Sequence, residues 1–155
     1  MAITFGSIIN TTTSLLNSNL TDPFNGTRTG SFFFNGDQEL TFTRFMPKGQ
    51  VTEDTETISN HGFGIPYERD EEYRINIHFF TKHNDVDPNT SLKNRALVVH
   101  YINLIKNVLI GSMASYGGFI LEFDSIERPI YLQDQQMYLG TIPIIFRTRK
   151  TGTSS

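Results

Sequence analysis

Apolar and polar positions alternate regularly in the second half of the chain. Between residues 73 and 82, Tyr73, Ile75, Ile77 and Phe79 alternate with mostly polar neighbours. This period of two is typical of a strand with one face on a core and the other exposed or against a partner. Two further strands are expected at residues 119–123 and 138–146.

The longest helical pattern covers residues 88–113. Apolar residues occupy most of the helix circumference, and a narrow polar stripe that includes His100 lies opposite. Such a helix needs a second neighbour besides one sheet, either the first helix or another subunit. Asp87 before Pro88 predicts a capped start, and Gly111 falls near the predicted end.

Residues 1–60 are rich in Thr, Asn and Gly and only weakly periodic. A short helix is expected around residues 8–20, and it should end before Pro23 because the residue before proline is pushed out of the helical region. Residues 32–46 predict a strand pair with a tight turn at residues 35–37.

The stretch from residue 50 to residue 72 is polar, and we interpret it as a long loop. Its charged run at residues 68–72 is expected to be a solvated surface. Residues 48–66 are therefore a candidate contact arm. Because the patterned core lies elsewhere, deletion of residues 50–60 is expected to leave the domain folded.

These elements predict one α+β domain over residues 1–150. It would be a small, mostly antiparallel sheet packed on one long helix and a shorter N-terminal helix, with a long polar arm. Pro143 cannot donate a ladder hydrogen bond, so its strand should be an edge or carry a bulge. Residues 127–136 are expected to form a polar loop, and residues 151–155 a flexible tail.

Composition narrows the possible functions. The net charge is −3 and no run of Lys or Arg occurs, which argues against general nucleic-acid binding. The absence of cysteine excludes disulfides and thiolate metal sites. No segment approaches the roughly 20 apolar residues that cross a membrane, so no membrane partner is expected.

The best candidate for a metal site is the loop after the first clear strand. His83 and Asp85 could share an ion, with His78 nearby. The loop from Asp85 opens like a calcium-binding loop, but its sixth position is Thr90 and its twelfth is Ala96, where glycine and glutamate are required. We therefore expect no metal and no cofactor, and interpret the polar residues as helix-capping. These capping residues are Asp85, Asp87 and Asn89.

No catalytic grouping is evident in the sequence. It contains no Gly-x-Ser-x-Gly elbow and no phosphate-binding loop. Paired carboxylates occur only in the charged run at 68–72, without an apolar pocket that would raise a pKa. The protein is therefore expected to bind other protein chains rather than to catalyse a reaction. A small enzyme or metal-binding domain that uses His78, His83 and Asp85 is the alternative.

The order of elements over residues 64–150 resembles the tail terminator proteins of tailed bacteriophages, and more widely their neck and tail-completion proteins. The order is the strand 73–82, a polar loop with proline, the helix 91–113, a strand, the loop at 132–136, and the segment 137–150. The resemblance implies a structural virion protein without catalytic residues. Its subunits would form a ring, commonly sixfold, that caps the tail tube and joins it to the head connector.

The resemblance also implies the partners and the location. The partners would be further copies of the chain together with tail tube and head-connector proteins, and the protein would reside in the virion after assembly in the host cytoplasm. A tail tube or head-closure protein is the alternative within this class.

A closed ring uses two different patches on each subunit. The first candidate is the polar face of the strand 73–82, and the second is the arm 48–66. The expected contact residues are Glu53, Asp54, Glu56, His61, Phe63, Arg74, Asn76 and His78.

Overall fold

The computed structural model describes residues 5–21, 32–35, 48–60, 67–117 and 119–152. The helices are α1 (Phe5–Asn19), α2 (Asn94–Gly111) and the 3₁₀ helix η1 (Met113–Tyr116). The strands are β1 (Phe33–Asn35), β2 (Lys48–Asn60), β3 (Tyr67–Lys82), β4 (Ile120–Phe123), β5 (Ile130–Leu132) and β6 (Met137–Gly152). They form one sheet in the order β1-β2-β3-β6-β4, and β5 also pairs with β6. Among these described strands only β1 and β2 are parallel.

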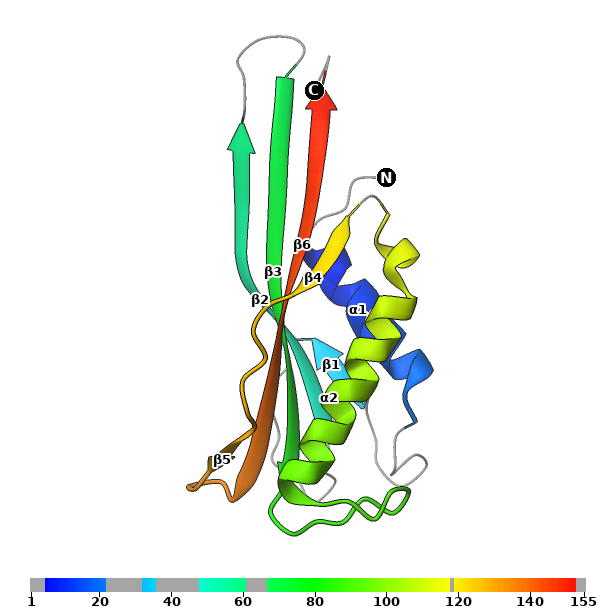
Figure 1. Ribbon diagram of the computed structural model, residues 1–155, viewed down its shortest axis with the longest axis vertical. Helices are drawn as coiled ribbons and strands as arrows, with labels where there is room; N and C mark the ends of the chain where they lie inside the picture. The colour runs from blue at the N-terminus through cyan, green and yellow to red at the C-terminus, as the bar shows by residue number, and fades with distance from the viewer. Residues whose placement is uncertain (1–4, 22–31, 36–47, 61–66, 118, 153–155) are drawn as a thin grey trace.

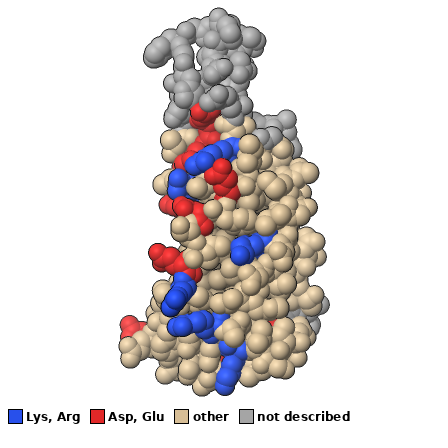
Figure 2. All heavy atoms as spheres, in the orientation of Figure 1, with Lys and Arg blue, Asp and Glu red and all other residues tan. Residues whose placement is uncertain are grey.

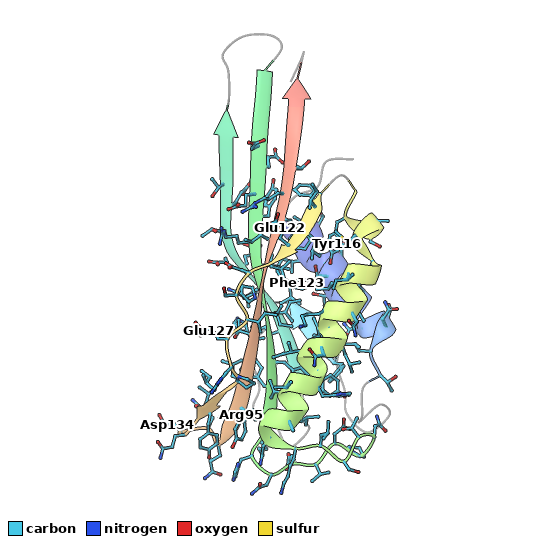
Figure 3. All side chains as sticks on the ribbon, in the orientation of Figure 1. Arg95, Tyr116, Glu122, Phe123, Glu127 and Asp134 are labelled. Carbon is cyan, nitrogen blue, oxygen red and sulfur yellow. The ribbon has the colours of Figure 1, made fainter. Side chains whose placement is uncertain are left out.

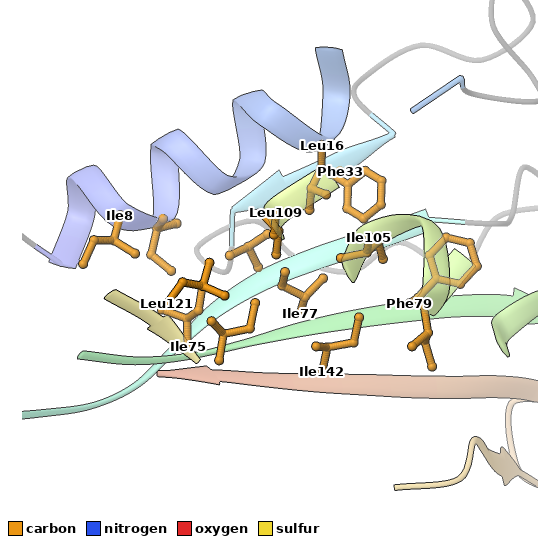
Figure 4. Close-up of a cluster of buried hydrophobic side chains, with 14 of the residues drawn as sticks. Ile8, Leu16, Phe33, Ile75, Ile77, Phe79, Ile105, Leu109, Leu121 and Ile142 are labelled. Carbon is orange, nitrogen blue, oxygen red and sulfur yellow. The ribbon is translucent and has the colours of Figure 1, made fainter. Parts of the chain in front are cut away.

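Both α-helices cover the same face of the sheet, as Figure 1 shows, so the expected α+β architecture is confirmed. The core lies between the helices and the sheet (Figure 4). The predicted packing of the central strand on the long helix is also confirmed, because Ile75, Ile77 and Phe79 share one buried cluster with Ile105 and Leu109. No helix in the described part of the chain is long and apolar enough to cross a membrane.

The N-terminal helix α1 is the second neighbour that the wide apolar surface of α2 requires. It contributes Ile8 and Leu16 to the core. The fully buried Thr12 donates its hydroxyl proton to the carbonyl of Ile8 at 2.8 Å, and it lies 2.7 Å from the hydroxyl of Tyr116. Tyr116 must therefore be the donor in the second bond. Burial raises the pKa of Tyr116 to about 12, so this proton is retained at neutral pH.

The start of the long helix differs from the prediction. It begins at Asn94 instead of residue 88, and Asp87 is not its cap. Asp87 is buried, and its carboxylate accepts hydrogen bonds from the backbone N–H of Asn89 and the hydroxyl of Thr90, at 3.0 and 2.9 Å. The side chain thus closes a turn within the loop, which competes with capping. The helix ends at Gly111, as expected.

The described residues of the polar stretch 50–72 are strands instead of a loop. β2 and β3 pair antiparallel along their lengths, so the described part of the expected arm 48–66 is one strand of a hairpin. The sequence pattern does not indicate a strand here, because the β2 side chains from residue 52 to Thr57 are exposed or half-buried on both faces and show no alternation. Val51 is fully buried, so deletion of residues 50–60 would open the core. The expectation that this segment is peripheral was wrong.

The charged run 68–72 belongs to β3 and is not a uniformly solvated surface. Glu71 is buried, and the hydroxyl of Tyr73 donates to its carboxylate at 3.4 Å. Burial, followed by the negative charges of Glu71 and Glu56, raises the pKa of Tyr73 to about 12. The run was misinterpreted because charged residues on both faces hide the period of two.

The last strand, β6, lies inside the sheet, between β3 on one side and β4 and β5 on the other. β6 is therefore not an edge strand as a whole, and its pairing with β3 has no bulge at Pro143. Pro143 does lie between the residues that pair with β4 and those that pair with β5, so the predicted edge occurs only locally. The carbonyl of Pro143 accepts a hydrogen bond from the N–H of Asp124 at 3.0 Å. The N–H and C=O positions of a strand residue point to the same side, so the position where Pro143 lacks an N–H faces the gap between β4 and β5. The ladder between β6 and β3 therefore loses no hydrogen bond.

Two expected irregular segments are partly strand. The loop at 127–136 contains β5, whose exposed Ile130 and Tyr131 hide the alternation. β6 continues to Gly152, so the expected tail 151–155 includes two strand residues. The described part of the expected hairpin at 32–46 contains β1, which pairs in parallel with β2. Residues 36–47, Pro23 and residues 153–155 lie outside the described residues.

Three strands continue beyond the helices, as Figure 1 shows. We call this extension the ribbon: residues 57–60 of β2, 67–72 of β3 and 147–152 of β6. The rest of the described chain is the body. Charged side chains gather on the sheet side of the molecule, whereas the helix side in view is mostly uncharged (Figure 2).

Candidate interaction surface

The sheet face turned away from the helices is polar along β3, and we call it the outer face. Arg74, Asn76 and His78 alternate with the buried Ile75 and Ile77. The pleat of the strand therefore places the three polar side chains in one row. The structure thus brings together three of the predicted contact residues.

A chain of ion pairs crosses the outer face where the body meets the ribbon. Glu72 accepts from Nε of Arg74 at 3.0 Å and from Nε of Arg147 at 2.9 Å. Arg147 also reaches Glu122 at 2.8 Å, and Arg74 reaches Asp124 at 3.4 Å. The network joins β3, β6 and β4 with Asp124, the residue that follows β4. Figure 3 labels Glu122 on β4. Each pair is part-exposed, so each is individually weak.

Glu72 is the centre of this network. Hydrogen bonds from Arg74 and then from Arg147 lower the pKa of Glu72, and the same contacts raise the pKa of both arginines. Glu72 is therefore ionised and fully engaged at neutral pH. Of these residues the sequence indicated only Arg74. Glu72 and Arg74 do share a strand face at positions two apart, but the partner residues Glu122 and Arg147 are distant along the chain.

His78 lies farther along the same row and bridges three strands. Its Nδ1 is 2.9 Å from the hydroxyl of Thr141 on β6, and its Nε2 is 3.3 Å from the hydroxyl of Thr52 on β2. Thr52 donates to the carbonyl of Asn76 at 3.4 Å, so it accepts from Nε2–H, and Nδ1 accepts from Thr141. Burial lowers the pKa of His78, which is consistent with a neutral ring between two hydroxyls.

The predicted acidic residues form a second group. Glu53, Asp54 and Glu56 are exposed on β2, where a bulge interrupts the pairing with β3. They lie on the strand beside the outer-face row instead of on a separate arm. His61 and Phe63 lie outside the described residues.

A groove of about 420 Å³ lies at the root of the ribbon. Among the described lining residues, Ile120 is an apolar side chain that is 61% exposed. The exposed surface of the groove is mostly apolar, and charged side chains such as those of Glu72 and Arg147 line it as well. The lining residues among the described residues are Thr57, Asp70, Glu71, Glu72, Ile120, Arg147 and Thr148.

The residues of the alternative metal site are not brought together. His78 lies on the outer face, whereas the ring of His83 packs 5.5 Å from that of Tyr131 and 6.0 Å from that of Tyr138. Asp85 is half-buried in the loop after β3, where its backbone N–H donates to the carbonyl of Lys82 at 3.3 Å. Within the described residues, no group of three or more His, Cys, Asp or Glu side chains could hold a metal ion.

Comparison with known proteins assigns no family. No protein-family model matches the chain, and no curated protein sequence matches it.

Proposed function

We propose that the protein is a structural virion component, a subunit that assembles with its own copies into a ring in the neck of a tailed bacteriophage. The ring would cap the tail tube and join it to the head connector, as the resemblance to the tail terminator proteins implies. The observation that carries the proposal is the ribbon, a sheet extension whose two outer strands have no further partner strand among the described residues.

The two edges follow from the strand pairing. β1 covers β2 only as far as Val51, and β4 covers β6 only as far as Arg147. Beyond these points, no strand of the described chain pairs with the outer edge of residues 52–60 or of residues 149–152. Unpaired N–H and C=O groups are a template for another strand. Two different edges on one subunit are what a closed head-to-tail contact requires.

The chemistry of the outer face favours binding over catalysis. The carboxylate of Glu72 is held by two arginines, and His78 is a neutral, part-buried ring between two hydroxyls. A general base must instead be free to reach a substrate proton. The outer face therefore supports an extended polar contact with another chain.

The ribbon can be shortened without entering the core. Ile58 and Glu71 are directly paired, so residues 59–70 can be replaced by Asn-Gly, which forms a tight hairpin turn. We expect the shortened protein to keep the circular dichroism of the parent and to lose the ring in native mass measurements and electron micrographs.

The matched control shortens the hairpin at the other end of β6. Leu132 and Met137 are also directly paired, so Asn-Gly can replace residues 133–136. This variant should keep the ring. Failure of the parent protein to form any ring would refute the proposed function, and rings formed by the ribbon-shortened variant would exclude the ribbon as the contact. Rings that stack into long tubes would favour the tail tube alternative.

A further inference from the structure

The two edge strands of the ribbon carry opposite charges. From Gly49 to its end, β2 contains three acidic residues and no Lys or Arg. β6 contains three basic residues and no Asp or Glu along its whole length. The acidic residues are Glu53, Asp54 and Glu56, and the basic residues are Arg147, Arg149 and Lys150.

We infer that the partner at each edge is a second copy of this chain, and that the acidic β2 edge of one copy pairs with the basic β6 edge of the next. The inference rests on the proposed self-assembly and names its interface. Opposite charges on neighbouring strands stabilise pairing, and like charges oppose it. Contacts between two β2 edges or between two β6 edges would join like charges, so only the head-to-tail contact is favoured.

The direction of the contact follows from the topology. β2 is antiparallel to β3, and β3 is antiparallel to β6, so β2 and β6 run in the same direction. Rotation about an axis that runs along the ribbon, at an acute angle to its strands, leaves the direction of each strand along that axis unchanged. Copies related by such a rotation therefore pair β2 with β6 in parallel, and the repeated contact closes into a ring.

The positions of the charges agree with a staggered contact. Glu56 is paired with Tyr73, which is paired with Phe146, so Glu56 is level with the residue before Arg147. The acidic residues thus lie in the body, next to the root of the ribbon, whereas the basic ones lie in the ribbon. Strands that close into a barrel are staggered relative to their neighbours. A stagger of a few residues toward the free end of the ribbon brings the two groups side by side.

Two of the charged residues with described side chains contact other residues of the chain, and the test leaves both unchanged. Arg147 binds Glu72 and Glu122, and the carboxylate of Glu56 lies near the hydroxyl of Tyr73. The β2 variant is E53K/D54K and the β6 variant is R149E/K150E, so both reverse two charges.

Each variant alone should require at least about a tenfold higher protein concentration for half-assembly, since several weak exposed pairs become repulsive. An equimolar mixture of the two variants should assemble again, because every contact then joins opposite charges. A single chain that carries all four substitutions should also assemble. Added salt should weaken assembly of the parent protein.

The control is E127K/D134K, which makes the same charge change as the β2 variant at exposed residues far from the ribbon (Figure 3). Circular dichroism checks that every variant is folded. Reversals that leave assembly unchanged, or that abolish it without rescue by mixing, overturn the charge-sorted contact while the ring of the parent protein stands. A parent protein that never assembles refutes the proposed function itself.

Discussion

The body and the ribbon are built from the same three strands but are stabilised differently. In the body, the inner faces of β3 and β6 pack on two helices, and residues such as Ile75, Ile77 and Ile144 are fully buried. In the ribbon the same strands continue without helices, and much of their sequence is charged. The change occurs at the level of Glu72 and Arg147, where the ion-pair network lies.

This difference assigns the stability of the fold to the body and the proposed contact with other chains to the ribbon. Burial of apolar surface contributes about 25 cal/mol per Å². Among the described residues, the main buried apolar cluster lies in the body. The ribbon depends on ladder hydrogen bonds and on cross-strand pairs that contribute roughly 0.2–1 kcal/mol each. A protruding sheet adds little to folding, which agrees with the proposed role in contact with other chains.

The largest expected effect is in the body and compares two isoleucines on α2. Ile105 is fully buried, so Ile105→Ala should lower the free energy of unfolding by about 2–5 kcal/mol. Ile110 is 55% exposed, so Ile110→Ala should change it by less than about 0.5 kcal/mol. Urea unfolding at neutral pH measures both. Similar losses from the two variants would mean that the body core is not where the structure places it.

The elements of the body could be predicted from the sequence because each has one apolar and one polar side. The alternation from Tyr73 to Phe79 and the wide apolar surface of α2 are of this kind. The ribbon could not, because its strands have polar residues on both faces. The start of α2 was missed because Asp87 closes a loop turn, which looks like a cap in the sequence.

The candidate surface was predictable only in part for a related reason. Arg74, Asn76 and His78 follow from the alternation of one strand. The partners that define the network, Glu122 and Arg147, come from other strands, and strand order cannot be inferred from a local pattern.

The next largest effect is expected at His78, which lies on the outer face between strands of the body. Burial lowers its pKa from 6.5, so the unfolded chain accepts a proton that the folded chain resists. The stability that the neutral ring contributes is full above pH 6.5 and is lost as the pH falls through the lowered pKa. Between about pH 8 and pH 5, the free energy of unfolding should therefore fall more in the parent protein than in His78→Gln. This extra loss should be smaller than the loss that Ile105→Ala causes.

Urea unfolding across this pH range measures the difference. His100→Gln, which replaces a histidine on α2, is the control and should follow the parent protein. An identical pH dependence in the parent and His78→Gln would show that the ring is not held neutral by its surroundings, and would make the outer face more open to water than its geometry indicates.

The smallest expected effect is at the boundary between body and ribbon. Glu72→Gln removes the charge that joins Arg74 and Arg147 while it keeps the shape of the side chain. The pairs are part-exposed, so the free energy of unfolding should fall by less than about 1 kcal/mol at pH 7 and low salt. Glu127→Gln, at an exposed residue outside the network, should have no measurable effect.

The pH dependence gives the sharper test of this boundary. The arginine hydrogen bonds lower the pKa of Glu72 from 4.5, so its contribution is full above pH 4.5 and is lost as the pH falls through the lowered pKa. The difference between the parent and Glu72→Gln should therefore disappear in acid, and should shrink in about 1 M salt as the charges are screened. A loss as large as that of Ile105→Ala, or one that persists in acid, would mean that the network holds the fold together. The ribbon would then be part of what stabilises the body, and the separation of stability from contact would be wrong.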